Sequence, residues 1–335
     1  MSAPAAPAPP LSPKERAARS PLSEFMRTYA SQIGITVAFV ALWLIFLVLA
    51  PDTFGGDRIY RSFAQTTPYF AIMAMAVTMV IVAGDIDLSF GSIMALGMVG
   101  FVFTYEATDN VLLGAIVTLG VGAAAGLFNG LVVTIIGLPS LVVTIGTQFL
   151  FRGLMLVLVA GRSFSFPEVR GDPTREILVG KPEAFFEIPM ELWWLIIVTI
   201  VSWVLLNRHR LGQNTYVIGD NVQTAQLMGT PIKRTRVTLF VLSGLAAAFA
   251  GLLNSLQFAS FFPSMGSQIL LPTLAAVFVG GTSVFGGRGS IYGTFIGAWM
   301  IGGIGAGIVA VGLTDFYTQL IYGAIILIAI SVHAV

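Results

Sequence analysis

Long apolar runs, separated by short polar stretches, make up most of the chain after residue 32. A helix needs roughly 20 apolar residues to cross ~30 Å of hydrocarbon, and lipid offers no partner to a free backbone amide, so such runs cross as helices. The pattern predicts ten spans, at 33–50, 66–83, 88–105, 111–136, 139–160, 191–206, 236–258, 268–284, 290–312 and 315–333. We therefore expect an all-α integral membrane protein with one transmembrane domain at 33–335.

Residues 1–32 break this pattern, because they are rich in Ala, Pro and Ser and too polar to pack. They lack the order of charge, short apolar run and cleavage site that marks a signal peptide. Such a composition cannot bury enough apolar surface to fold. The segment is predicted to be a flexible cytoplasmic tail before an uncleaved first span.

Lys and Arg positions predict the orientation, because cytoplasmic loops carry more of them. With the tail inside, the inner segments hold ten Lys and Arg, the outer loops hold six, and Arg152 falls within a span. The count favours an N-in, C-in topology, with a periplasmic loop at 161–190 and the largest cytoplasmic loop at 207–235. Spans two to five and seven to ten then begin on opposite sides, as an inverted repeat requires.

Composition supports this class and excludes others. The chain is 56% hydrophobic and only 10% charged, whereas a soluble domain carries about a quarter of charged residues. A net charge of +1 and the absence of cysteine argue against a nucleic-acid partner, disulfides and thiolate metal sites. His209 and His333 have no metal-ligand or triad spacing, and no G-x-x-x-x-G-K-[ST] motif occurs. We expect no catalytic residue, no metal site and no cofactor bound by this chain.

The stretch DIDLSFGS at 85–92 places carboxylates between two strongly apolar runs. Asp85, Asp87 and Ser89 can each accept a hydrogen bond from the free amides that begin the third span. Gly91 and Ser92 allow close helix contact. One interpretation is a capped turn near the cytoplasmic face, where the carboxylates stay hydrated. The other is a broken-helix site for a cation, a proton or a polar solute; the topology favours the turn.

Further polar residues lie within or beside the spans. Arg152 sits well inside the fifth span, where an arginine costs at least ~2.5 kcal/mol and must face a polar interior, a carboxylate or backbone carbonyls. Direct solute contact and a structural tie both remain open for it. Asn129, Gln148, Asn254 and Gln257 are the other candidates to line a hydrophilic path, or to hold helices together.

The cytoplasmic loop 207–235 contains a predicted short helix from Asn221 to Gly229. Asn221 is a suitable N-cap, and Gly229 with Pro231 is a suitable stop. Both ends of the loop are basic. A short helix between ends anchored at the interface fits a docking element for a partner, whereas the alternative is a solvated connector.

Four segments, taken together, resemble a known family. AGDIDLSFGS at 83–92, TIGTQFLFRG at 144–153, GDNVQTAQLMG at 219–229 and FGGRGSIYGTFIGA at 285–298 resemble, in this order, the signatures of inner-membrane permeases of ATP-binding-cassette importers. The branch is the one that handles ribose, xylose and similar simple sugars. The resemblance covers nearly everything after the tail.

This resemblance implies a homodimer of ten-span subunits in the bacterial inner membrane, a periplasmic sugar-binding protein outside and ATPase subunits inside. It further implies that a coupling segment seats in the ATPase, with Gly219, Asp220, Asn221, Ala225 and Gly229 at the positions of the motif. Asp220 and Gln226 depart from the family pattern, which puts in doubt which ATPase this subunit accepts.

The expected function is therefore the translocation subunit of an ATP-driven, binding-protein-dependent importer for a monosaccharide or similar small polyol. One alternative is a self-powered carrier that uses Asp85 or Asp87 as a proton or sodium site. An intramembrane enzyme is a second alternative, which the absence of a histidine or metal cluster in any span disfavours.

Overall fold

The computed structural model describes residues 30–183, 187–313 and 316–334. The predicted tail falls almost wholly outside these ranges, and its last residues, 30–32, lie in the first turn of helix α3 (Ala30–Leu49).

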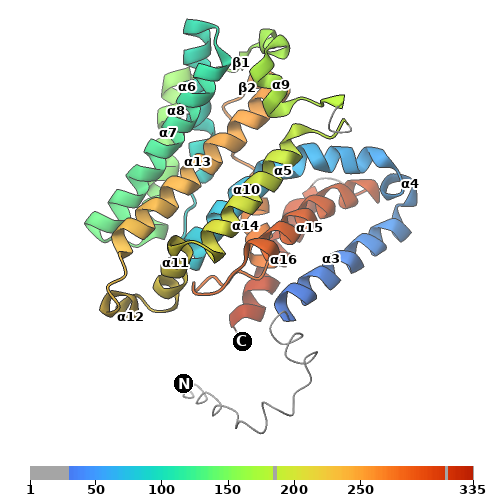
Figure 1. The fold of residues 1–335 in the computed structure, drawn as a ribbon. Coiled ribbons are helices and arrows are strands. Elements are labelled where there is room, and N and C mark those ends of the chain that lie inside the picture. Colours follow the sequence, from blue (N-terminus) through green and yellow to red (C-terminus); the bar gives the residue numbers. More distant parts are fainter. Residues whose placement is uncertain (1–29, 184–186, 314–315, 335) are drawn as a thin grey trace.

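Nearly all of the regular structure is helical (Figure 1). The long helices after α3 are α5 (Asp57–Val82), α6 (Phe90–Thr108), α7 (Val111–Leu131, followed by the π-helix Val132–Ile136), α8 (Ser140–Val159), α10 (Met190–Asn207), α13 (Ile232–Phe258), α15 (Ile291–Ala310) and α16 (Phe316–Ala334). The short elements are α4 (Pro51–Phe54), the 3-10 helix Pro167–Gly171, α9 (Pro173–Val179), α11 (Arg210–Asp220), α12 (Val222–Leu227), α14 (Leu270–Val279) and the antiparallel strand pair β1 (Phe164–Ser165) and β2 (Ser260–Phe261).

Eight of the described helices are long and apolar enough to cross a membrane. They coincide with the first seven predicted spans and the ninth, although α5 begins nine residues before the predicted start at 66. The predicted span at 315–333 lies on α16, whose apolar part, Tyr317–Ala329, is shorter. The total of ten spans therefore remains a prediction.

The predicted span at 268–284 is not formed as one helix. In its place stands α14, which has ten residues and is about 15 Å long at 1.5 Å per residue. That length covers half of the hydrocarbon core. Non-helical chain flanks α14 on both sides, and Gly266 (φ 76°) and Gly281 (φ 85°) adopt left-handed conformations there. Such backbone is tolerated at membrane depth only when buried in protein or lining a water-filled cavity.

Helix α13 is the centre of the bundle and packs against α5, α6 and α7. Its contact with α7 is backbone to backbone, because Gly126 and Gly130 stand four residues apart on the facing side of α7. A Cβ atom at Gly126 would lie 2.9 Å from the Cα of Val241, and one at Gly130 would lie 2.8 Å from the Cα of Val237. Helices α6, α7 and α13 therefore form a closely packed frame.

Helices α3 and α8 lie at the edges of the bundle. α3 packs mainly on α15 and α4, and α8 mainly on α6. Apolar side chains of α8 project outward, including Phe149 (72% exposed) and Val157 (77% exposed). This face of α8 suits contact with lipid or with another membrane subunit.

The two four-helix sets that the sequence predicts as an inverted repeat, α5–α8 and α13–α16, share a layout. Each opens with its longest helix, 26 residues in α5 and 27 in α13. In each set a non-helical linker follows, residues 83–89 in the first and 259–269 in the second apart from the short strand β2. This layout supports the repeat, which remains a prediction.

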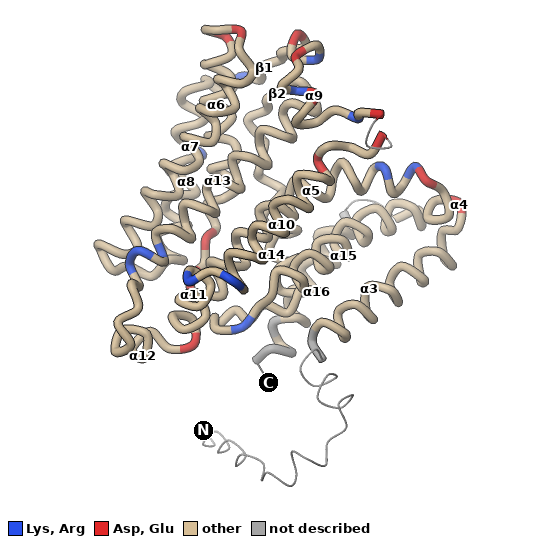
Figure 2. The backbone as a smooth tube through the Cα atoms, in the orientation of Figure 1, with Lys and Arg blue, Asp and Glu red and all other residues tan. Residues whose placement is uncertain are grey.

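The bundle has two distinct ends, which we name the α12 end and the strand end after the elements they carry (Figure 1). The first turn of α3 and the last turn of α16 both lie at the α12 end, in keeping with termini on one side. Basic positions gather around α11 at the α12 end, and most acidic positions lie towards the strand end (Figure 2). This distribution fits a cytoplasmic α12 end.

Substituting Gly126→Ala should lower the thermal stability of the purified protein, because the new methyl group collides with the backbone of α13; overpacking of this kind costs about 1–3 kcal/mol. Gly120→Ala is the matched control, since a Cβ atom there meets nothing within 4 Å. Equal melting temperatures for the two variants, measured in detergent, would contradict the close α7–α13 contact.

Candidate functional site

The predicted short helix of the cytoplasmic loop is present as α12, with the predicted start and stop. The Asn221 Oδ1 accepts a hydrogen bond from the Thr224 amide at 2.9 Å. At the other end Gly229 adopts φ 71°, and the Thr230 amide donates to the Ala225 carbonyl at 3.0 Å. Both ends of this six-residue helix are therefore fixed by local hydrogen bonds.

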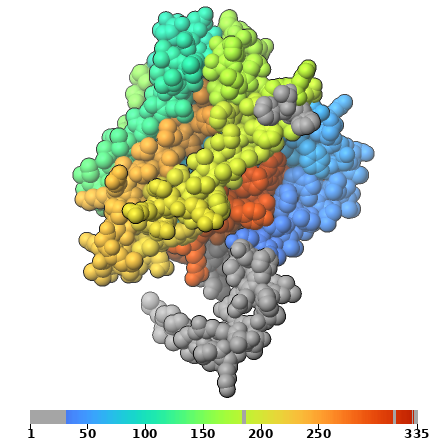
Figure 3. All heavy atoms as spheres, in the orientation of Figure 1, coloured from blue at the N-terminus to red at the C-terminus, as the bar shows by residue number. Residues whose placement is uncertain are grey.

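The outer side of α12 ends in a pair of large exposed apolar residues. Leu227 is 91% exposed and Met228, which follows it, is 68% exposed. Figure 3 shows this part of the chain at the lower left of the surface. Exposed large apolar residues at a tip mark an interaction surface more often than a solvated connector. The motif did not single these two residues out; a pair of large apolar residues in a polar loop was the available signal.

Ala225, which the motif assigns to the coupling segment, points the other way. It is fully buried against its own chain, so it anchors α12 and cannot touch a docked partner. Of the other residues in the segment, Asp220 and Asn221 are exposed, and Gly219 lies inward at the end of α11.

Gly219 takes part in a contact among three chain segments that we name the glycine junction, made of Gly84, Gly219, Gly286 and Gly287. A Cβ atom at Gly219 would collide with the Val82 carbonyl oxygen and lie 2.6 Å from the Gly287 amide nitrogen. That amide donates to the Val82 carbonyl at 2.9 Å. The end of α11 thus rests directly on the end of α5 and on the loop before α15.

A side-chain contact reinforces the glycine junction. The Tyr216 hydroxyl in α11 donates to the Gly289 carbonyl at 2.8 Å. Burial raises the pKa of Tyr216, so its phenol stays neutral and keeps this donor. These contacts hold α11 against the end of α5 and the loop before α15.

From the glycine junction the 83–89 linker turns back into the bundle, which places Asp85 and Asp87 in the interior. Asp85 is 5% exposed and Asp87 is fully buried. The expectation that these carboxylates stay hydrated near a membrane face is therefore wrong. Asp85 forms an ion pair with Arg236 of α13, with Oδ2 2.9 Å from Nε, and the Ile86 amide donates to the Ser140 hydroxyl of α8 at 3.0 Å.

Asp87 accepts hydrogen bonds from neutral donors on neighbouring elements. Its Oδ1 accepts from the Ser89 amide at 2.8 Å and the Ser89 hydroxyl at 2.7 Å, and its Oδ2 accepts from the Ser243 hydroxyl at 2.7 Å. Asn129 of α7 donates to the Ser89 oxygen at 2.7 Å. Asp87 therefore holds the start of α6 against α7 and α13. The Ser89 hydroxyl accepts from Asn129 and donates to Asp87, but it does not accept from the first amides of α6, as the sequence predicted.

Arg152 bridges the second linker to α6. Its guanidinium donates to the carbonyls of Pro263 at 2.9 Å and Met265 at 2.8 Å, and more weakly to that of Gly91 at 3.5 Å. Of the two roles left open by the sequence, this geometry supports the structural tie. Arg152 is the thirteenth residue of α8, about 18 Å along that helix at 1.5 Å per residue, so the tie lies well inside the bundle.

The start of α6, which directly follows the first linker, meets the second linker at this level. A Cβ atom at Gly91 would lie 2.5 Å from the Gly266 carbonyl oxygen, so the close contact predicted for Gly91 is made, with the second linker. Ser92 is buried beside it. Non-helical segments that enter a bundle and interrupt its helices are where carriers place their solute sites.

The residues predicted to line a hydrophilic path lie in different environments. Asn129 is buried in the Asp87 network and Arg152 is occupied by backbone carbonyls. Gln148 and Gln257 are half-buried on α8 and α13. Asn254 lines a cavity of about 230 Å³ beside the second linker.

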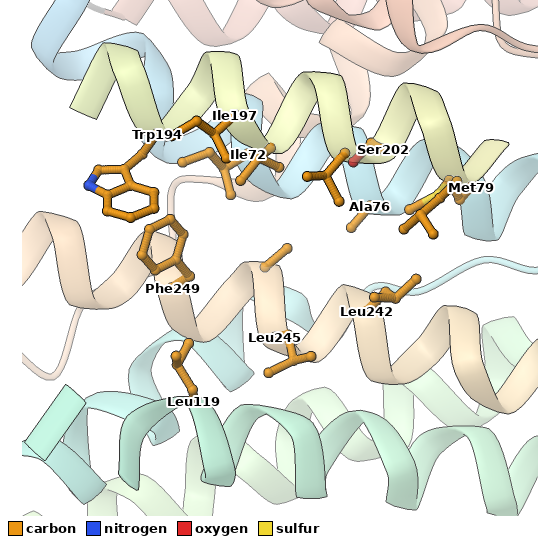
Figure 4. Close-up of a pocket in the computed structure, with 14 residues that line it drawn as sticks. Ile72, Ala76, Met79, Leu119, Trp194, Ile197, Ser202, Leu242, Leu245 and Phe249 are labelled. Atoms are coloured by element: carbon orange, nitrogen blue, oxygen red, sulfur yellow. The ribbon is translucent and has the colours of Figure 1, made fainter. Parts of the chain in front are cut away.

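A different cavity, of about 300 Å³, lies between α5, α10 and α13, with Leu119 of α7 at its edge (Figure 4). Trp194 and Phe249 face each other at one end, with ring centroids 5.4 Å apart. Its lining is apolar apart from Ser202. A polar solute would lose about 1–3 kcal/mol for each hydroxyl left unpaired there, so this crevice is not a path for one.

Residues 59–330 match the sequence profile of the family described as "Branched-chain amino acid transport system / permease component". The chain is 32% identical to the Autoinducer 2 import system permease protein LsrD of Salmonella typhi, over 91% of each chain. It is 30% identical to the Ribose import permease protein RbsC of Escherichia coli K12, over 92% of this chain and 95% of that one. No solved structure matches the chain.

Substituting Asp87→Leu should destabilise the protein by about 2 kcal/mol or more, because buried donors of Ser89 and Ser243 lose their acceptor. Glu106→Leu, at the exposed far end of α6, is the control and should change little. Thermal unfolding of both purified variants checks this. An Asp87→Leu protein as stable as the control would show that the network does not hold the helices together.

Proposed function

Because the chain belongs to the family of branched-chain amino acid transport system permease components, we propose that it is the translocation subunit of an ATP-driven, binding-protein-dependent importer for a monosaccharide or similar small polyol. The chain is a multi-pass protein of the bacterial inner membrane. The sugar class is supported by the relative named as a ribose import permease, similar over nearly the whole chain.

The observation that carries this proposal is the exposed apolar pair at the tip of α12, which directly follows the end of α11 that rests on the glycine junction. Leu227 and Met228 offer a docking surface to an ATPase subunit, while the buried Ala225 and the Gly219 contacts join that surface to α5 and α15. A partner that changes shape on ATP turnover would then favour one state of the bundle over another. Only a difference in contact energy between the two states can shift their populations.

The rest of the assembly belongs to the same proposal. ATP hydrolysis is assigned to a separate subunit, because the sequence carries no phosphate-binding loop. A second copy of the permease completes the membrane unit, and a periplasmic sugar-binding protein delivers solute at the strand end.

The self-powered carrier receives less support from the geometry. A proton or sodium site needs a carboxylate free to exchange its partner, whereas Asp85 is paired with Arg236 and Asp87 accepts three hydrogen bonds. Both carboxylates are better explained as ties between the first linker and its neighbouring helices.

Substituting Leu227→Asp should reduce retention of the ATPase subunit and uptake of labelled monosaccharide by about tenfold or more, as loss of a central docking residue costs at least ~2 kcal/mol. Gln226→Asp places the same charge on the neighbouring exposed residue and should have a much smaller effect. Co-purification and uptake in cells are the measurements. Full ATPase retention and full uptake in Leu227→Asp would rule out docking at this tip.

A further inference from the structure

The cavity of about 230 Å³ lies beside the contact between the start of α6 and the second linker. Arg152 ties the second linker to α6 and α8 next to it. The cavity is lined by one residue each from α6 and α13 and by the second linker: Met94, Asn254, Phe262, Ser264, Met265, Gly266, Gln268 and Ile269. It therefore extends from the strand end, where Phe262 directly follows β2, into the interior of the bundle.

The lining has the chemistry of a site for hydroxyl groups. The amides of Asn254 and Gln268 each provide both donors and an acceptor, and the hydroxyl of Ser264 does the same. None of the residues that line this cavity is charged. The Phe262 ring, 48% exposed, adds an apolar face. These residues suit a neutral solute that carries hydroxyl groups around a ring and has an apolar ring face.

The surroundings of the cavity are not those of a lipid-facing surface. Ser264, Ser267 and Gln268 are exposed on the single chain, and they stand on non-helical backbone within the span of the bundle. Lipid does not tolerate such backbone, so this surface lines an aqueous path or is covered by protein. The cavity of about 300 Å³ between α5, α10 and α13, in contrast, has an almost wholly apolar lining that suits contact with hydrocarbon.

We propose that this cavity binds the transported solute on its way through the bundle. Asn254 and Gln268 hydrogen-bond hydroxyl groups of a single monosaccharide-sized molecule, Ser264 contributes a third polar contact, and Phe262 covers the ring. A volume of about 230 Å³ is below the ~300–1,000 Å³ of pockets for drug-sized ligands, so a single small ring suits it. The inference rests on the proposed function and adds the place and chemistry of recognition.

Uptake by the full transporter in cells tests the contacts, with radiolabelled D-ribose as the first probe and other pentoses and hexoses after it. Asn254→Leu and Gln268→Leu should each lower the uptake rate about tenfold, because a hydroxyl of the solute is left unpaired, while ATPase retention stays unchanged. Gln213→Leu is the matched control, the same type of change at an exposed amide on α11 that does not line the cavity.

Because the chain has no cysteine, water access can be measured independently. In the otherwise unchanged full chain, Ser264→Cys should react with a charged, membrane-impermeant thiol reagent, and D-ribose should slow the reaction. Val157→Cys, on the apolar face of α8, should stay unreactive.

The outcomes separate this inference from the proposed function. Normal uptake by Asn254→Leu and Gln268→Leu, or an unreactive Ser264→Cys, overturns the cavity assignment and leaves the importer intact. A wild-type transporter that takes up none of the probe sugars overturns the sugar class in both proposals, even if Ser264→Cys reacts.

Discussion

The fold depends on carrying non-helical backbone into a helical membrane bundle without leaving its polar groups unpaired. Two linkers do this, 83–89 after α5 and 259–269 after α13. The guanidinium of Arg152 satisfies carbonyls of the second linker, and the carboxylate of Asp87 satisfies the Ser89 amide and hydroxyl at the end of the first. Gly91 and Gly266 have no side chain, so the start of α6 and the second linker can approach each other closely. These ties let α6 and α14 begin inside the bundle and hold the second linker in place, which lines the cavity together with α6 and α13.

The same linkers connect the α12 end with the interior of the bundle. The first linker begins at the glycine junction, where α11 rests on backbone atoms of Val82 and Gly287. Backbone contacts have no rotamer that could absorb a displacement, so in the proposed coupling a movement of α12 would pass through α11 to α5, to α15 and along the linker. The linker ends at the contact of Gly91 with Gly266, beside the cavity. Docking surface, glycine junction and cavity are thus joined by a continuous series of close contacts.

Hydropathy predicted most of the long helices correctly, because lipid imposes one length and one composition on every span. Hydropathy could not predict that α14 stops after ten residues, because a short helix with apolar residues on both sides has the same hydropathy profile as a full span. The burial of Asp85 and Asp87 was missed because their partners, Arg236 and Ser243, lie about 150 positions away in the sequence. The acceptors of Arg152 are backbone carbonyls, which no side-chain pattern marks. The sequence predicted correctly those features whose contacts lie within a few residues, such as the N-cap and the stop of α12.

The most direct test of the account is transport by a Gly219→Val variant, whose side chain would separate α11 from the end of α5 without altering the exposed face of α12. Gly34→Val, where a Cβ atom meets nothing within 4 Å, is the control. The measurement is the amount of sugar taken up per ATP hydrolysed by the assembled transporter. The account predicts that Gly219→Val keeps the ATPase bound and hydrolysing while uptake per ATP falls about tenfold. Unchanged uptake per ATP in a stably folded Gly219→Val transporter would contradict it.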